Sequence, residues 1–284
     1  MSGRQRCLIN QDCLPLSLET KRSKADIESV ELYFHRFGSG PPIVILHGLF
    51  GSSRNWQSIA HNLAEKFSVI TVDLRNHGSS PHTKKMTYSS MALDVSLLLQ
   101  NLDLQNIILI GHSMGGKTAM TLALTEPDRI SQLVIVDIGP GAYNNSYNNL
   151  IKAMSELDLS LLNRRRDAHT QLRQAIPEHK TRTFLLQNLI FNAGSSPHWR
   201  INLPAIRDSI GEIVSAIICD KTEPFNRPTY FLQGEYSNRI SDEHLPAIRE
   251  FFPQWKLITI ADSDHLPHIE NPKDFLSKLD HLID

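Results

Sequence analysis

The sequence predicts one large α/β domain with a mostly parallel central sheet, helices flanking that sheet, and an inserted helical lid. Short apolar runs rich in β-branched residues, such as 43–46 and 107–110, alternate with helical patterns along much of the chain. That alternation is typical of parallel strands covered on both faces. It stops from residue 142 to residue 225, where the chain reads as helices broken by prolines, and then resumes. A length of 284 residues is consistent with one such domain carrying an insertion.

The elements of the core follow one another in a regular order. The expected strands are residues 30–37, 43–46, 68–72, 107–110, 132–136, 229–233 and 256–260. The expected helices are residues 56–64, 91–102, 117–124, 243–250 and 273–282. These elements divide the chain into an N-terminal arm (1–29), a core (30–141 and 226–284) and a helical lid insertion (142–225). Such an insertion usually covers the carboxyl ends of the strands, where folds of this kind bind ligands.

Charge and composition exclude several functions. The 29 lysines and arginines nearly balance the 30 acidic residues, which gives no electrostatic reason to expect a nucleic-acid partner. No apolar run approaches the roughly 18–20 residues that span a bilayer, so no transmembrane segment is expected. The three cysteines, Cys7, Cys13 and Cys219, lack metal-type or redox-type spacing, which favours a reduced compartment over a disulfide framework. We expect neither a metal nor a cofactor.

The first residues contain a weak targeting signal. Arg4 and Arg6 precede the first acidic residue, Asp12, and three more basic residues follow between positions 21 and 24. Transit peptides are rich in arginine and serine and poor in acidic residues. Because the bias is mild over a short stretch, residues 1–29 are expected to form either a targeting segment or an untargeted flexible arm.

The segment Gly111-His112-Ser113-Met114-Gly115 has the pattern that places a nucleophilic serine on a sharp turn between a strand and a helix. A buried strand precedes this turn and a helical run follows it, so the required context is present. The turn holds the serine in a strained conformation that costs about 1–3 kcal/mol. The helix that begins there directs free backbone N–H groups toward negative charge. Ser113 is therefore the expected nucleophile.

A serine that transfers acyl groups needs a base, and the expected order along the chain is serine, acid, histidine. The loop between the last strand and the last helix contains His265, the expected base, and His268, the alternative. A metal pair formed by these two is disfavoured because no third ligand follows at useful spacing. His47, His77 and His112 occupy glycine-containing turns, where we expect them to act as hydrogen-bonding struts.

The loop 47–51, which follows strand 43–46, is the expected source of one donor to an oxyanion. We assign the first donor to the backbone N–H of Leu49, with Phe50 as the alternative, and the second to the N–H of Met114. Loss of one such donor typically costs about 2.7–4 kcal/mol of activation barrier. The competing interpretation is a glycine-rich strand exit without a catalytic role.

The acid is the least determined member of the site. Strand 229–233 is where many such enzymes carry it, yet no aspartate follows at the usual place, and Glu235 comes early. Asp262 and Asp264 lie too close to the base in sequence to reach round to the far nitrogen of its ring. Asp137 ends the buried strand 132–136, where a charge without a task would carry a desolvation cost. We expect Asp137 to be the acid; the alternative is that it only caps the following turn.

Taken together, these motifs resemble those of the α/β-hydrolase fold serine hydrolases. The resemblance is to the group formed by the mitochondrial α/β-hydrolase-domain protein eleven, related bacterial esterases and yeast ethanol acetyltransferases. The segments that carry it are 47–52, 72–78, 111–117, 136–138 and 199–203, within a match that runs from about residue 30 to the end. The resemblance implies an α/β-hydrolase fold and a triad of Ser113, Asp137 and His265. It also implies the mitochondrial matrix, with the cytoplasm as the alternative.

Three functions follow from these residues and the resemblance. The leading hypothesis is a serine hydrolase that cleaves carboxylic esters or thioesters of lipid-like acyl groups through an acyl-enzyme. The first alternative is an alcohol acyltransferase that uses the same acyl-enzyme, and the second is a slow-turnover protein of the same fold that binds a ligand or partner. The expected partner is a small acyl ester or thioester, and the sequence identifies no protein partner.

Two features of the insertion have competing interpretations. Apolar residues at helical spacing either line an acyl pocket or form the core of the lid, the commoner fate of such a stripe. They are Leu150, Met154, Leu157, Leu161 and Leu162. The run of three arginines at 164–166 is typical of a solvated helix face rather than of a partner site.

Overall fold

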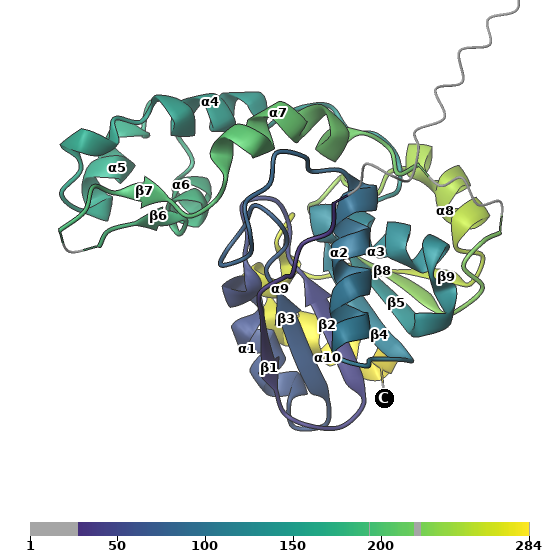
Figure 1. Cartoon of the computed structure of the whole chain (residues 1–284). Coiled ribbons are helices and arrows are strands. Elements are labelled where there is room, and N and C mark those ends of the chain that lie inside the picture. Colours follow the sequence, from purple (N-terminus) through teal and green to yellow (C-terminus); the bar gives the residue numbers. More distant parts are fainter. Residues whose placement is uncertain (1–27, 193, 219–222, 284) are drawn as a thin grey trace, which may run out of the picture.

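The computed structural model describes residues 28–192, 194–218 and 223–283 (Figure 1). The expected arm therefore lies almost entirely outside the described residues, as do Cys7, Cys13 and Cys219. Within the described part, no helix is both long enough and apolar enough to cross a membrane.

One seven-stranded sheet forms the centre of the molecule, in the order β1-β3-β2-β4-β5-β8-β9. Its strands are β1 (Phe34–Phe37), β2 (Pro42–Leu46), β3 (Ser68–Val72), β4 (Ile107–His112), β5 (Ile130–Val136), β8 (Thr229–Gly234) and β9 (Trp255–Ile260). All neighbouring pairs are parallel except β1 with β3. The mostly parallel sheet predicted from the alternating pattern is confirmed, and β1 begins four residues later than expected.

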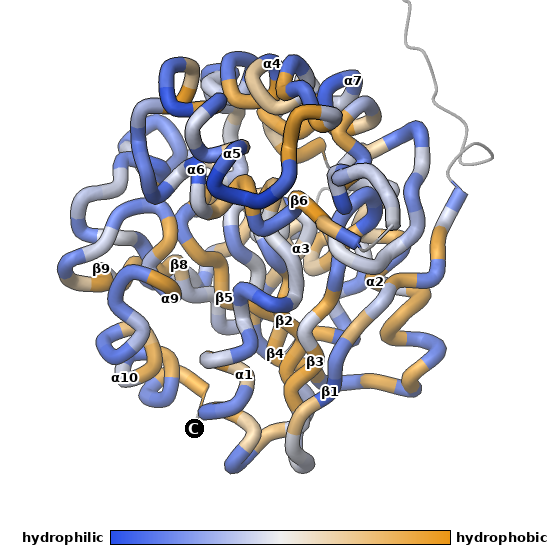
Figure 2. The backbone as a smooth tube through the Cα atoms, turned by 90° about the vertical axis from the view of Figure 1, so that its left-hand side faces the viewer, coloured by the Kyte–Doolittle hydropathy of each residue, from blue (hydrophilic) through white to orange (hydrophobic). Residues whose placement is uncertain are grey.

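Helices cover both faces of this sheet. They are α1 (Gln57–Leu63), α2 (Tyr88–Asn101), α3 (Met114–Thr125), α8 (Leu245–Phe251), α9 (Pro267–Glu270) and α10 (Pro272–Ile283), with short 3₁₀ helices η2 (Ser53–Trp56), η3 (Pro127–Arg129) and η5 (Asp242–His244). Apolar side chains of α1 and α10 pack on one face, and those of α2, α3 and α8 pack on the other. Hydrophobic strands consequently occupy the middle of the molecule (Figure 2). Burial on both faces explains why these strands read as continuous apolar runs.

The segment between β5 and β8 forms a separate layer above the sheet edge (Figure 1). It contains α4 (Asn148–Glu156), η4 (Leu159–Leu161), α5 (Arg165–Gln171), α6 (His179–Leu186), β6 (Leu189–Ile190), β7 (His198–Trp199) and α7 (Leu203–Val214). The antiparallel pair β6–β7 was not expected, because strands of two residues have no readable periodicity. We call the segment from 142 to 214 the insertion.

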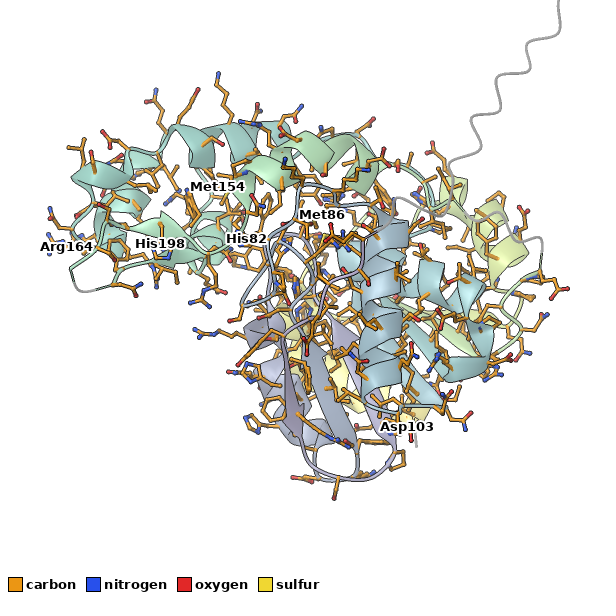
Figure 3. The ribbon with its side chains drawn as sticks, viewed as in Figure 1. His82, Met86, Asp103, Met154, Arg164 and His198 are labelled. Atoms are coloured by element: carbon orange, nitrogen blue, oxygen red, sulfur yellow. The ribbon has the colours of Figure 1, made fainter. Side chains whose placement is uncertain are left out.

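Side-chain hydrogen bonds tie the insertion to loops that follow the parallel strands. Asn202 Nδ2 donates to Asn76 Oδ1 at 3.1 Å, and the Asn202 N–H donates to the Asn76 carbonyl at 3.0 Å. His82, labelled in Figure 3, donates from Nε2 to the carbonyl of Arg200 at 3.0 Å. The insertion therefore lies over the carboxyl ends of the strands.

The leucine and methionine stripe of the insertion is largely internal. Met154, labelled in Figure 3, is fully buried, and Leu157 and Leu162 are buried with it in a cluster continuous with the main core. Leu161 is 65% exposed on η4 and does not belong to the stripe. The stripe thus forms the core of the insertion, and this packing supplies no evidence for an acyl pocket.

A buried lysine joins the two limbs of the insertion, that is, the segments by which the chain enters and leaves it. Lys117 on α3 donates from Nζ to the carbonyls of Gly141 and Ser215, at 2.6 and 2.5 Å, where the chain enters and leaves the insertion. The limbs also bond to each other, since the Ile217 N–H donates to the Pro140 carbonyl at 2.9 Å. Lys117 is 1% exposed, and within the described residues it has no carboxylate partner.

Replacing Lys117 by methionine is expected to lower the free energy of unfolding. The change leaves two partly buried carbonyls without this donor, at up to about 1–3 kcal/mol for each. Burial, and to a smaller extent the charge of Arg239, lowers the pKa of Lys117 to about 7 in the folded chain. The unfolded lysine has a pKa near 10.4, so unfolding takes up a proton between about pH 7 and pH 10.

The advantage of the wild type over Lys117→Met should therefore grow as pH rises through this window. The increase is at most about 1.4 kcal/mol per pH unit, because one proton is involved. Urea unfolding of both proteins near pH 7 and near pH 9 measures it. Equal stability of the two proteins at both pH values would contradict the interpretation of Lys117 as a clamp.

Candidate active site

Ser113 lies on the sharp turn between β4 and α3, with φ 50° and ψ −116°. This left-handed conformation is unusual for a residue with a side chain and costs about 1–3 kcal/mol. The turn needs glycine nearby, because a Cβ on Gly115 would lie 2.5 Å from the carbonyl oxygen of His47. The Ser113 N–H donates to the Val136 carbonyl at 3.0 Å, which fixes the turn against β5.

The structure brings Ser113, His265 and Asp137 together from three separate loops. His265 Nε2 lies 3.1 Å from Ser113 Oγ, and His265 Nδ1 lies 2.8 Å from Asp137 Oδ2. Asp137 is fully buried, whereas the His265 side chain is 27% exposed. Because a carboxylate only accepts, the proton sits on Nδ1 and leaves Nε2 free to accept from the serine hydroxyl. The geometry is that of a nucleophile, a base and an orienting acid.

Two further groups bind the Asp137 carboxylate, and sequence reasoning did not identify either. The Ser237 hydroxyl donates to Oδ2 at 2.6 Å, and the Gly234 N–H donates to Oδ1 at 3.1 Å. Gly234 ends β8, the strand where many such enzymes carry the acid, and Ser237 follows it. The sequence around Ser237 contains no signal that identifies this contact. Asp137 itself has φ 53°, and its carboxylate is directed toward His265 and the β8 exit, so it does more than cap its own turn.

The competing acids form other hydrogen bonds. Glu235 accepts the N–H of Asp262 at 2.9 Å, and the Asp262 carboxylate accepts the Tyr236 hydroxyl at 3.1 Å. Asp264 is exposed, and its N–H donates to Glu270 at 2.6 Å. Within the described residues none of these carboxylates bonds to His265.

Two neighbouring histidines are buried and neutral. His112 donates from Nε2 to the main-chain carbonyl of His265 at 2.7 Å, and burial lowers its pKa well below the usual value. The His268 ring stacks on Trp56 with centroids 4.0 Å apart and an interplanar angle of 3°. Burial lowers the pKa of His268 to about 3. His112 therefore positions the loop of His265, while His268 packs in the core.

The loop after β2 lies directly against Ser113. A Cβ on Gly48 would lie 3.2 Å from the Cβ of Ser113. The Phe50 N–H is already committed to His77 Nε2, at 3.2 Å. Among the described residues, the N–H groups of Leu49 and Met114 have no acceptor. This pattern favours Leu49 over Phe50 as the donor to an oxyanion.

The expected histidine struts hold this loop in place. His47 accepts the Leu74 N–H on Nε2 at 3.0 Å, and His77 donates from Nδ1 to the Arg75 carbonyl at 3.0 Å. Burial lowers the pKa of both histidines, that of His77 to about 3, so both rings are neutral and able to accept. The insertion adds one contact, since Asn188 Nδ2 donates to the Phe50 carbonyl at 2.8 Å.

Within the described residues, no group of three or more histidine, cysteine or acidic side chains is arranged to hold a metal ion. The functional groups that the site brings together are a hydroxyl, an imidazole and a carboxylate.

Comparison with known proteins gives consistent matches. A family model described as alpha/beta hydrolase fold matches residues 41–272. The chain is 38% identical over 269 residues to the "sn-1-specific diacylglycerol lipase ABHD11" of Danio rerio, covering 92% of this chain and 84% of that protein. It is 36% identical over 258 residues to the "Probable alcohol acetyltransferase" of Saccharomyces cerevisiae, covering 82% and 74% respectively.

A solved structure named "Marine microorganism esterase" is 39% identical, with a TM-score of 0.87 over 90% of this chain and 100% of that one. The fold and the length of these matches agree with one another. The chain belongs to the α/β-hydrolase fold family.

Proposed function

We infer that this protein is a serine hydrolase that cleaves carboxylic esters or thioesters of lipid-like acyl groups. The observation that carries the inference is the continuous hydrogen-bonded chain from Ser113 through His265 to Asp137. The lipase and esterase names of its relatives support an ester of a lipid as the substrate. The insertion over the strand ends supports its role as a lid above the site.

The reaction proceeds through an acyl-enzyme. Ser113 Oγ attacks the acyl carbon as its proton passes to His265 Nε2, and the N–H groups of Leu49 and Met114 bind the resulting oxyanion. The intermediate collapses, the bond to the alcohol or thiol breaks, and the leaving group takes the proton from His265. Water then gives a proton to His265 and attacks the acyl carbon, and Ser113 leaves with that proton, releasing the carboxylic acid.

Alcohol transfer is a second candidate, favoured by the similarity to the yeast protein named as an acetyltransferase. Transfer uses the same acyl-enzyme and differs only in the acceptor. Product analysis with an acyl thioester, water and a competing alcohol decides between the two. We expect free carboxylic acid as the main product; a new ester as the main product would favour transfer. Absence of turnover on a series of acyl chain lengths would favour a binding protein.

Replacing Asp137 by asparagine is expected to reduce kcat by about 10⁴-fold, the size measured for this change in another Ser-His-Asp enzyme. The asparagine amide donates where the carboxylate accepted, so the His265 proton moves to Nε2 and blocks transfer from Ser113. Steady-state kinetics on a short-chain ester measures the loss. Glu235→Gln is the matched control and should keep most activity, because Glu235 binds the Asp262 backbone. The opposite ranking of these two variants would refute the assignment of the acid.

We propose the mitochondrial matrix as the location of the protein. The support is the resemblance to a mitochondrial member of the family together with Arg4 and Arg6 near the start of the sequence. Fractionation of cells that express a C-terminally tagged chain tests this proposal. Recovery of the protein only in the cytosol would contradict it.

A further inference from the structure

A groove lies between the loop after β2 and the insertion. It has a volume of about 250 Å³ and is lined by residues of both parts, including Phe50, Asn188 and three arginines. A second hollow of about 200 Å³ shares Ser52, Arg54 and Arg200 with it, so the two hollows adjoin at these residues. We call the two together the arginine groove.

Its three arginines come from distant parts of the chain. Arg54 lies on η2 of the core, Arg165 begins α5, and Arg200 follows β7. Arg165 Nη2 donates to the Leu189 carbonyl at 2.6 Å, which fixes its guanidinium. All three arginines of the run 164–166 are exposed, as expected of a solvated face, and Arg165 also lines the groove. Arg164, at the outer end of the insertion in Figure 3, is 73% exposed.

The three arginines of the groove outnumber its one lining carboxylate, Asp73. Within the described residues, none of the three guanidinium groups forms an ion pair with a carboxylate. Burial, followed by the charge of Arg54, lowers the pKa of Arg200, and Asp73 opposes this shift. Asp73 lines the second hollow, but its carboxylate oxygens already accept the N–H groups of Ser53 and Ser79, at 2.7 and 2.8 Å.

A second observation indicates a missing polar ligand. The Ser53 hydroxyl is buried and has no hydrogen-bond partner in the described part of the chain, although Ser53 lines the second hollow. Buried hydroxyl groups are normally satisfied by protein or by a bound molecule. Three guanidinium groups thus line the groove, and a buried hydroxyl without a partner among the described residues lies beside it.

The groove is also next to the reaction site. Phe50 lines it, and Phe50 belongs to the same short loop as Gly48, which abuts Ser113. Asn188, from the insertion, lines the groove and bonds to the Phe50 carbonyl at 2.8 Å. Phe50 and Asn188 thus join the groove to the loop that contacts Ser113, although Ser113 itself does not line the groove.

We propose that the arginine groove binds a phosphate group on the leaving half of the substrate, that is, on the alcohol or thiol that the reaction releases. A phosphate monoester carries about −1.5 to −2 charges and three acceptor oxygens, and arginine binds such groups in a bidentate manner. A volume of 250 Å³ holds a phosphate with several waters, since one water takes about 30 Å³. The inference rests on the function proposed above.

Two matched substrate pairs test the proposal. One compares 1-butanoylglycerol with its 3-phosphate, and the other compares S-butanoyl pantetheine with its 4′-phosphate. The short chains keep the substrates in solution, away from any lipid surface. We expect a higher kcat/KM for at least one phosphorylated member, and the pair that shows it identifies an oxygen ester or a thioester as the substrate.

Arg54→Gln and Arg200→Gln should each lower the ratio of kcat/KM for the phosphorylated over the unphosphorylated substrate by about tenfold, the effect of losing one charge-assisted hydrogen bond. Arg54 is exposed, so its replacement has little effect on folding. Arg207→Gln is the matched control, because Arg207 lies on α7 outside the groove and pairs with Asp208 at 2.9 Å. That variant should keep the wild-type ratio.

Several results would overturn the inference. These are an equal kcat/KM for both members of each pair, or a ratio that the Arg54 and Arg200 variants leave unchanged. A loss of binding to anionic vesicles in these variants with an unchanged ratio would show a membrane contact instead. Labelling of Ser113 by a fluorophosphonate probe separates this inference from the proposed function. Labelling without a phosphate preference refutes only the inference, and absence of labelling refutes the proposed function itself.

Discussion

Replacement of Ser113 by alanine should abolish labelling by a fluorophosphonate probe and reduce kcat by about 10⁶-fold, the scale seen when a serine nucleophile is removed. The change removes only the hydroxyl group, whose oxygen lies 3.1 Å from His265 Nε2. Gel-based labelling and steady-state kinetics on a short-chain ester measure the two effects. Persistent labelling of the variant would show that another residue is the nucleophile.

The backbone at Ser113 provides an internal control for this experiment. Alanine keeps the Cβ, so Ser113→Ala should retain the strain of φ 50° and unfold near the wild-type temperature. Glycine adopts this conformation without a steric cost, so Ser113→Gly should be inactive yet more stable by about 1 kcal/mol. A glycine variant less stable than the alanine variant would contradict the presence of strain at this turn.

Replacement of His265 by glutamine should reduce kcat by a similar factor of about 10⁶, because the serine then has no base. In the wild type, kcat/KM should rise with pH through a single ionisation, since His265 must be neutral to accept the serine proton. The nearby His112 and His268 do not add a second ionisation, because burial lowers the pKa of each. A profile of kcat/KM against pH for the purified enzyme measures the number of ionisations.

His268→Phe is the matched control for the base. The His268 ring stacks on Trp56, and within the described residues its Nδ1 has no hydrogen-bond partner, so phenylalanine preserves the packing. We expect this variant to keep most activity and the same pH profile. If His268→Phe lost activity while His265→Gln kept it, the base would be His268.

Local signals in the sequence were sufficient for the strands and for the serine turn. β4 is a continuous apolar run, and the two glycines around Ser113 are required by backbone approaches closer than 3 Å. The apolar run and the glycine spacing can be read directly from the sequence, although the approach that requires Gly115 comes from His47 on another loop. The place of Asp137 beside Ser113 could also be predicted from the sequence, because the carboxyl ends of adjacent parallel strands meet at one edge of the sheet.

Other parts depend on contacts between distant segments and had no local signal. Ser237 lies 100 residues from Asp137, and nothing in its own neighbourhood indicates that its hydroxyl meets that carboxylate. The arginine groove likewise needs Arg54 and Arg200, which only the folded insertion brings together. The pair β6–β7 is too short for any periodic pattern to be read.

The clamp at Lys117 has a consequence for protein engineering. Both limbs of the insertion meet at this one side chain, through the carbonyls of Gly141 and Ser215. Every residue has a backbone carbonyl. An insertion from another protein joined at these two points would therefore still accept hydrogen bonds from Lys117. A graft would thus keep the contacts of Lys117, whereas those of Asn188 and Asn202 with the core depend on the side chains of the segment itself.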